Sequence, residues 1–317
     1  MTITRRGVLA GAGLALAAGK AHAQAYPNRA IRIIVPYAAG GADTYIRPLQ
    51  NQWSQALGQS VVIESVTGGG GALGVNRVRS SAPDGYTLLF AGTGALTAVP
   101  RLQNLNYSIA DLAPIANLIA IPYVLAGRRG GRFTDFAGFL REARVRPEGL
   151  SYGTPGVGST PHLIMESLSK AADIKLLHVP YSGVATAAVA LLAGDIDLVM
   201  GAPSFIMPLV ERGVVPIVQT GARRMAAIPD VPTFRENGLD LELVTRFGFF
   251  APKGTDTAIL DRWGSLILEG GGERGYIEAM QRTYNEVELL DRARFQAFLV
   301  EEDTATERLL RELNLRG

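Results

Sequence analysis

Apolar runs of strand length alternate with longer segments of helical periodicity along most of the chain. Ile31–Val35 is almost continuously apolar and rich in β-branched residues, which is typical of a strand covered on both faces. Pro36 ends this run, because proline cannot donate to a β-ladder. Gly40 and Gly41 then allow a sharp turn before a helix that begins near Thr44. The order of strand, small-residue turn and helix predicts an α/β fold.

The pattern continues through two lobes. The first lobe is predicted to add strands over 60–64 and 87–90, and helices over 44–57 and 74–81, with an irregular first turn at Pro48. This βαβαβ order favours a parallel sheet with helices on its faces. The second lobe is predicted to hold strands over 150–153, 175–179, 196–200 and 214–220, with helices that end near 146, 172 and 194. We expect Thr134 to cap the first of these helices.

Two segments are predicted to connect the lobes. Residues 113–126 are apolar and contain Pro114 and Pro122, which indicates a segment that crosses into the second lobe. Residues 246–252 are expected to form a strand that returns to the first, followed by helices and one extended piece at 286–288. We therefore predict that residues 24–125 and 230–317 form lobe 1 and residues 126–229 form lobe 2. A hinge would join them, with the ligand cleft between.

Residues 1–23 have the pattern of a cleaved export signal. Arg5 and Arg6 precede an apolar run, and Ala21–Ala23 is a small-x-small site before Gln24. The route can be either general secretion or twin-arginine export, because the arginine pair fits both. Removal of the signal leaves 28 basic and 29 acidic residues, so the formal net charge changes from +2 to −1. A periplasmic protein is expected, and this charge balance shows no nucleic-acid footprint.

Composition and motifs argue against most enzyme classes. The absence of cysteine excludes disulfides and thiolate sites, and three histidines are too few for a His-rich metal site. No nucleophile elbow or phosphate-binding P-loop occurs after the signal. Gly69–Gly74 matches G-x-G-x-x-G, so a nucleotide-dependent enzyme is the alternative, but the next acid, Asp84, comes too early for the ribose role. We expect no catalytic residue, metal or cofactor.

Two loops that follow strands and precede helices are the candidate anion sites. Helix starts present free N–H groups, which favour a carboxylate. The candidate residues of the two loops are Tyr37, Ala39, Gly40, Gly41 and Asp43 in the first, and Thr154, Gly156, Gly158, Ser159 and Thr160 in the second.

Several of these residues have two interpretations. Asp43 can cap its helix or face the pocket. Ser159 or Thr160 can cap the following helix, and Thr160 suits the cap because Pro161 suits the next position. The glycines of the second loop would leave its other N–H groups open to an anion. Thr93, in a third loop, is a further candidate ligand residue, and Tyr37 and Tyr181 can line the pocket or pack at the edge of the core.

A set of motifs in a fixed order resembles the substrate-binding proteins of tripartite tricarboxylate transporters, the Bug or TctC family. The motifs include Ile31–Tyr37, Ala82–Leu89, Asp111–Ile115, Tyr152–Ser159, His178–Gly183, Gly194–Asp197 and Ile228–Thr233. The chain departs from the family pattern at Ala42, which alone separates Gly41 from Asp43 where two residues are usual.

The resemblance implies a periplasmic protein with a type II-like periplasmic binding protein fold. It would capture a small organic acid between the two loops as a monomer and deliver it to membrane transporter subunits. The acid could be a mono-, di- or tricarboxylate, an aromatic acid or an acidic amino acid. An extracytoplasmic sensor that hands its closed form to a signalling partner is the other interpretation.

Overall fold

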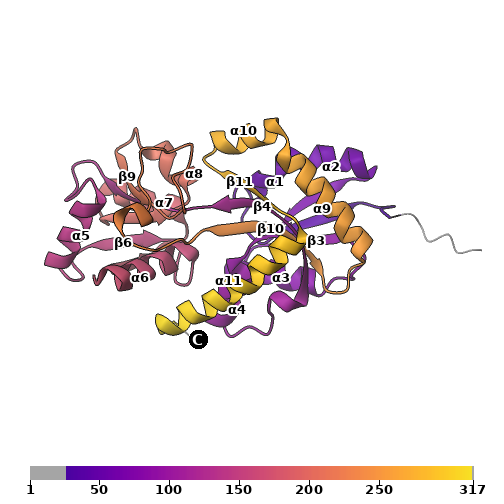
Figure 1. The fold of residues 1–317 in the computed structure, drawn as a ribbon, viewed down its shortest axis with the longest axis horizontal. Helices are drawn as coiled ribbons and strands as arrows, with labels where there is room; N and C mark the ends of the chain where they lie inside the picture. Colours follow the sequence, from indigo (N-terminus) through magenta and orange to yellow (C-terminus); the bar gives the residue numbers. More distant parts are fainter. Residues whose placement is uncertain (1–25, 316–317) are drawn as a thin grey trace, which may run out of the picture.

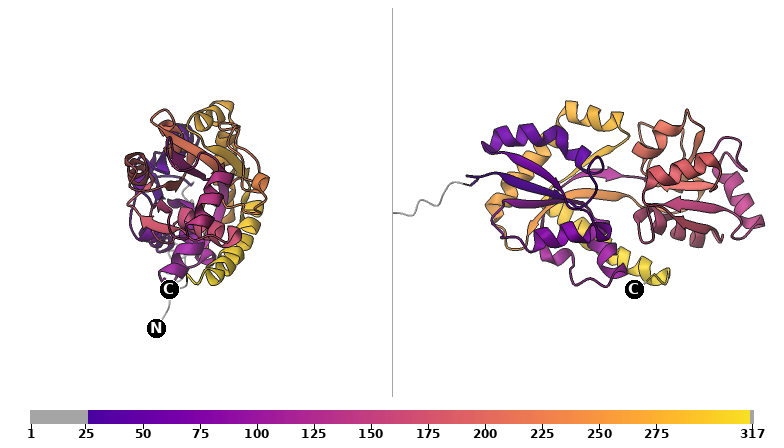
Figure 2. Two further views of the ribbon diagram at one scale, coloured as in Figure 1. Left: turned by 90° about the vertical axis from the view of Figure 1, so that its left-hand side faces the viewer. Right: turned by 180° about the vertical axis from the view of Figure 1, so that it is seen from behind.

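The structure, a computed structural model, describes residues 26–315, so the expected export signal lies outside the described residues. The described chain forms two lobes that lie side by side and are linked by extended strands (Figure 1). The view from behind shows the same two bodies, with the C-terminal end of the chain below the junction between them (Figure 2).

Lobe 1 is built on a six-stranded sheet. In order across the sheet the strands are β11 (Glu286–Leu290), β4 (Leu112–Ile121), β10 (Thr245–Pro252), β3 (Thr87–Gly92), β1 (Ile31–Val35) and β2 (Val61–Ser65). Strand β1 pairs in parallel with both β2 and β3, which confirms the predicted βαβαβ unit. Strands β10, β4 and β11 pair antiparallel.

Helices cover both faces of this sheet. They are α1 (Asp43–Ile46), η1 (Arg47–Leu49), α2 (Gln50–Leu57), η2 (Gly69–Gly71), α3 (Ala72–Arg79), α4 (Gly94–Leu102), η3 (Ile109–Asp111), α9 (Thr257–Gly272), α10 (Arg274–Arg282) and α11 (Arg292–Glu312). One face buries Trp53, Phe249 and Trp263 fully. The ring centroid of Trp53 lies 5.5 Å from that of Phe249 and 5.9 Å from that of Trp263. Helix α11 buries Phe295 and Leu299 against the other.

Lobe 2 is built on a five-stranded sheet. Its strands in order are β7 (Leu177–Pro180), β6 (Ser151–Thr154), β8 (Leu198–Gly201), β5 (Val124–Arg128) and β9 (Val214–Gln219). Its helices are α5 (Phe136–Val145), α6 (Thr160–Ala172), α7 (Val184–Ala193), α8 (Pro203–Ile206), η4 (Met207–Leu209) and η5 (Arg235–Asn237). The predicted strands and helices of this lobe are confirmed within a few residues, whereas α8 and η4 were not anticipated.

The predicted crossing segment is confirmed, and the structure adds that it is made of two strands. Residues 112–128 form two strands of different sheets, β4 and β5, separated by Pro122 and Tyr123. Proline interrupts the ladder at this point because it has no N–H. The strand β10 returns to lobe 1 as predicted. The end of α11 also spans the gap, since Leu310 packs with Ala98 of α4 and Leu163 of α6.

The irregularity expected at Pro48 is confirmed, because the helix expected over 44–57 is broken there into α1, η1 and α2. Two helix caps differ from the predictions. Asp135, not Thr134, caps α5 by accepting a hydrogen bond from the Gly138 N–H. Ser159, not Thr160, caps α6 by accepting one from the His162 N–H.

Candidate ligand-binding cavity

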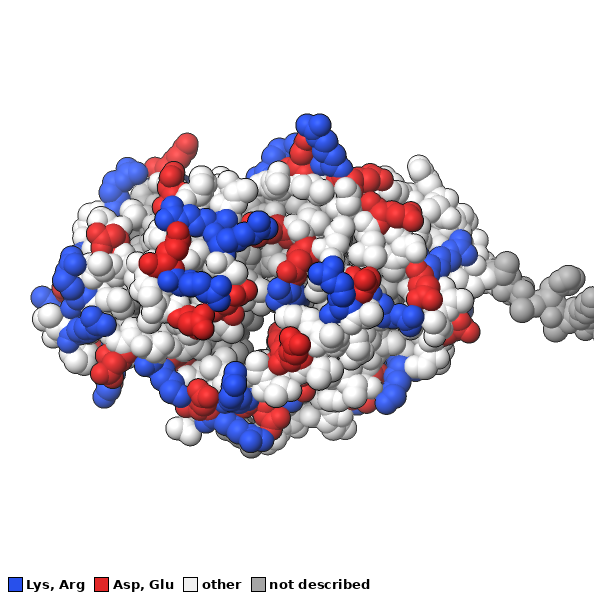
Figure 3. Space-filling view, viewed as in Figure 1, with Lys and Arg blue, Asp and Glu red and all other residues white. Residues whose placement is uncertain are grey.

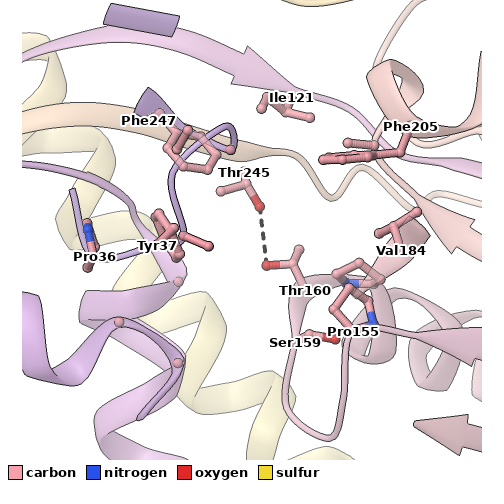
Figure 4. Close-up of a pocket in the computed structure, with 18 of the residues that line it drawn as sticks. Pro36, Tyr37, Ile121, Pro155, Ser159, Thr160, Val184, Phe205, Thr245 and Phe247 are labelled. Carbon is pink, nitrogen blue, oxygen red and sulfur yellow. Dashed lines mark hydrogen bonds between the residues drawn. The ribbon is translucent and has the colours of Figure 1, made fainter. Parts of the chain in front are cut away.

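A cavity of about 1200 Å³ lies between the lobes and is lined by residues of both. Lobe 1 contributes the loop after β1, the start of α4 and the turn before β11. Lobe 2 contributes the loop between β6 and α6, together with α8. Figure 4 shows Tyr37 and Phe247 on one side of this space, and Phe205 and Val184 on the other.

The structure brings half of the predicted site residues to this cavity. Those that line it are Tyr37, Gly40, Gly41, Gly158, Ser159 and Thr160. The predicted residues outside the lining are Ala39, Asp43, Thr93, Thr154, Gly156 and Tyr181. Both predicted loops therefore contribute residues to the cavity wall, whereas their other predicted residues lie outside the lining.

Backbone N–H groups at the cavity have no partner within the described chain. They include those of Gly40, Ala42 and Gly94 in lobe 1, and those of Val157 and Thr160 in lobe 2. The N–H of Gly158, which the sequence suggested would stay open, instead donates to Nδ1 of His162 at 3.1 Å. Unpaired N–H groups at helix starts carry positive partial charge, so the cavity favours an anion.

Asp43 neither caps a helix nor lines the cavity. It is the first residue of α1, behind the uncapped Ala42, and its side chain is 1% exposed. Its Oδ2 accepts a hydrogen bond from Nε of Arg47 at 2.7 Å, whereas Oδ1 has no partner among the described residues. With only Ala42 after Gly41, the helix begins at Asp43 and its carboxylate turns inward toward Arg47.

Thr93 lies behind the cavity and not in its wall. Its hydroxyl donates to Glu302 of α11 at 2.7 Å, and its N–H donates to the Arg246 carbonyl. Burial raises the pKa of Glu302 to about 7, and Oε2 of this carboxyl has no partner within the described chain. These contacts fix the start of α4, whose first residue, Gly94, lines the cavity.

Thr154, Gly156 and Tyr181 support the second loop from below. The Thr154 hydroxyl contacts Nε2 of His178 at 2.7 Å, and the Gly156 carbonyl accepts from the Ser159 hydroxyl at 2.7 Å. The Tyr181 N–H donates to the Thr154 carbonyl. Tyr181 thus follows its structural interpretation and packs with the lobe 2 core.

A row of hydroxyls from both lobes crosses the cavity, and the sequence did not suggest it. Tyr123 and Thr245 are 2.9 Å apart at their oxygens, and Thr245 donates to Thr160 at 3.2 Å (Figure 4). Thr245 belongs to β10 and Thr160 to α6, so this hydrogen bond joins the lobes. The sequence gives no local signal for Thr245, because its partner Thr160 lies 85 residues away on the other lobe.

The rest of the wall is mainly apolar. Phe247 packs edge-on against Tyr37 and Tyr45, with ring centroids 5.9 and 5.4 Å away. Burial raises the pKa of both tyrosines, so both hydroxyls keep their protons at neutral pH. Among the described lining residues, Arg282 alone has a charged side chain.

The described residues hold no group of three or more His, Asp and Glu that could bind a metal ion. In the same part of the chain, every helix is too short or too polar to cross a membrane. On the face seen in Figure 3, basic and acidic side chains are interspersed over both lobes.

The fold and the cavity together define a class. Two α/β lobes joined by crossing strands, with one large cavity between them, are the architecture of type II-like periplasmic binding proteins. The solved structure of Rpa4515 from R. palustris with adipate matches 91% of this chain and 98% of its own, at 26% identity and a TM-score of 0.82. MatC from Rhodopseudomonas palustris with bound malate matches 90% of this chain and 100% of its own, at 27% identity and a TM-score of 0.79.

The family follows from the sequence comparisons. The model of the tripartite tricarboxylate transporter family receptor, TctC, matches residues 45–315. A UPF0065 protein in the gbd 5′ region of Cupriavidus necator is 32% identical over 99% of this chain and 97% of its own length. The chain therefore belongs to the TctC family of solute-binding proteins, which confirms the resemblance drawn from the motifs.

Proposed function

We propose that this protein captures a small organic acid between its lobes and binds the carboxylate through backbone N–H groups. The observation that carries the proposal is the set of unpaired N–H groups of Gly40, Gly94, Val157 and Thr160 around one cavity. A hydrogen bond to a charged group contributes roughly 1.5–3 kcal/mol, so a few of them support micromolar binding after ordering costs. The adipate and malate in the two related structures are also carboxylates.

The wall favours an acid with an apolar body. Phe205 is 42% exposed and Val157 is 71% exposed, and both line the cavity from lobe 2. A ligand that covers them removes apolar surface from water, at about 25 cal/mol per Å². Additional carboxylates would have Arg282 as their one cationic partner among the described lining residues.

Because the ligand would contact both lobes, it should stabilise the closed arrangement over an open one. We propose that the closed form, exported to the periplasm, delivers the acid to the membrane subunits of a tripartite transporter, as the family name suggests. A sensor role would use the same closed form on a signalling partner, and transport assays with and without the gene would separate the two.

The test is calorimetric titration of the purified protein with benzoate, adipate, malate, citrate and glutamate. We expect micromolar binding of benzoate or adipate, weaker binding of citrate, and recovery of the acid unchanged. Small-angle scattering should show compaction with the bound acid. Binding of no acid, or chemical conversion of the acid at a rate above the buffer blank, would contradict the proposal.

A further inference from the structure

Both histidines of the described chain lie together beneath the second ligand loop. His162 is on α6 and His178 is on β7, and their rings stack with centroids 4.2 Å apart at 23°. Tyr152 of β6 continues the stack, 4.9 Å from His178. The stack lies outside the cavity lining, so any effect on a ligand must pass through the loop.

His162 holds the loop through its ring nitrogen. The N–H of Gly158 donates to Nδ1 at 3.1 Å, which requires a lone pair on Nδ1 and therefore a neutral ring protonated at Nε2. That second nitrogen lies 3.7 Å from Oε1 of Glu166, the next turn along the helix. His162 is 5% exposed, so water cannot easily replace the contact.

His178 holds the other end of the loop. Its Nε2 lies 2.7 Å from the Thr154 hydroxyl, which is itself 3.3 Å from both the N–H and the carbonyl of Gly156. The two rings thus support Gly156 and Gly158, the residues that flank Val157. This support leaves the N–H groups of Val157 and Thr160 unpaired at the cavity.

We propose that His162 is a positioning residue for the ligand, and that only its neutral form keeps the second loop in its binding shape. The proposal rests on the proposed function, because it needs a ligand that uses this loop. Protonation would place a hydrogen on Nδ1, facing the N–H of Gly158, and two donors cannot form a hydrogen bond. The loop would then lose its anchor, and the protein would release its acid as the pH falls.

The surroundings keep both rings neutral near pH 7. Burial lowers the pKa of His162 below its ordinary value of 6.5, against the opposing attraction of Glu166. Burial, together with the neighbouring His162, lowers the pKa of His178 to about 4. The titratable groups that face His162 are Glu166 on its own helix, His178 on β7, and Tyr152 on β6, whose hydroxyl donates to Glu166 at 2.7 Å.

A matched pair of variants tests the hydrogen bond. His162→Asn places a side-chain oxygen near the position of Nδ1 and keeps an acceptor for Gly158, whereas His162→Leu keeps bulk and removes the acceptor. The ligand is whichever of benzoate, adipate and malate binds the wild type most tightly. At pH 7.5 we expect the Leu variant to bind about tenfold more weakly, which corresponds to one hydrogen bond, and the Asn variant to stay within about threefold. Equal losses in both variants would overturn the proposal.

The pH dependence supplies a readout that simple destabilisation would not change. Affinity is measured from pH 8 to pH 4.5 for the wild type and for His162→Asn. Protonation of the acid itself changes both affinities by the same factor, so it cancels in the ratio of the two affinities. We expect the wild type to lose affinity relative to the Asn variant toward the acid end of this range, because burial lowers the pKa of His162 below its ordinary value of 6.5. A ratio that stays constant with pH would overturn the proposal.

A ligand-free measurement keeps this proposal separate from the proposed function. In ¹⁵N-labelled protein, we expect a scalar coupling between the Gly158 amide nitrogen and Nδ1 of His162. The coupling should disappear as the imidazole takes up a proton, while the signals of distant amides keep the positions they have in the folded protein. If the coupling is present but no acid binds, the proposed function is wrong, whereas the hydrogen bond between Gly158 and His162 is confirmed. If the coupling is absent in the folded wild type, the anchor is wrong whatever the protein binds.

Discussion

The two ligand loops occupy equivalent places but are built differently. The lobe 1 loop, residues 36–43, keeps its shape mainly through its own backbone, with the Gly41 N–H donating to the Ala38 carbonyl at 3.1 Å. The lobe 2 loop, residues 154–160, is held by side chains that include Ser159, His162 and His178. The shape of a loop held by side chains depends on the hydrogen bonds and protonation of those side chains. The shape of a loop formed by glycines depends mainly on the backbone angles that the glycines allow. The following substitutions separate these two kinds of control.

Gly158→Val should have the largest effect. Gly158 has a φ of +79°, and an added Cβ would lie 2.6 Å from Cδ1 of Leu102 in the opposite lobe. Backbone strain and displacement of Leu102 together should cost about 2–4 kcal/mol, so affinity for the acid should fall at least about 30-fold by calorimetry. Gly156→Val is the control for backbone strain without a clash, since its φ is +116° but the nearest atom to an added Cβ is 4.0 Å away. Wild-type affinity in Gly158→Val would remove the lobe 2 loop from the mechanism.

Gly40→Val should have a smaller effect on the same titration. Its φ of +84° is unfavourable for valine, but nothing lies within 4 Å of an added Cβ. Strain alone predicts a loss of about 1–3 kcal/mol in binding or stability. Gly254→Val, with a φ of +88° and equally open space outside the cavity lining, should reduce stability without changing affinity. If both variants weaken binding equally, the lobe 1 loop has no special role.

Glu302→Gln tests a side chain that supports the start of α4 in lobe 1 from behind. The native pKa of about 7 exceeds the ordinary 4.5, so the folded state binds more protons than the unfolded state between these values. The contribution of Glu302 to stability is therefore greatest at acid pH and is lost as pH rises from 4.5 to 7. We expect the variant to gain about 1–2 kcal/mol of unfolding free energy relative to the wild type at pH 8, and less at pH 5. Urea unfolding at both pH values measures this, and an equal difference at both would contradict it.

Ser159→Ala should have the smallest effect. The side chain caps α6 and donates to the Gly156 carbonyl, but the N–H groups of Val157 and Thr160 remain after its removal. We expect a loss on the order of 1 kcal/mol, measured as a shift in thermal unfolding together with a slight weakening of binding. A loss as large as that of Gly158→Val would mean that the hydroxyl itself contacts the acid.

The sequence predicted where helices and strands occur better than it predicted the residues at which they begin and end. Buried strands such as β1 and β3 are mainly apolar runs, so their positions could be predicted, and α2 ends at residue 57 as expected. Ser159 and Thr160 are both capable caps, and only the path of the backbone decides between them. The lobe boundaries at residues 126 and 229 stay predictions.

Site residues that depend on distant parts of the chain could not be predicted. Thr245 reaches Thr160 only because the lobes meet, and Glu302 reaches Thr93 across more than 200 residues of sequence. The contact between Gly158 and His162 is different, because a spacing of four residues at a helix start lets the side chain reach back to the loop. That spacing was visible in the sequence and could have drawn attention to His162.

The aromatic core of lobe 1 has a consequence for spectroscopy. Both tryptophans of the chain, Trp53 and Trp263, are fully buried there, and neither lines the cavity. Tryptophan emission should therefore be nearly silent when an acid binds, and should shift to the red only when lobe 1 unfolds. Because lobe 2 contributes tyrosines but no tryptophan, comparing this emission with far-ultraviolet circular dichroism would show whether the two lobes melt as one unit or in sequence.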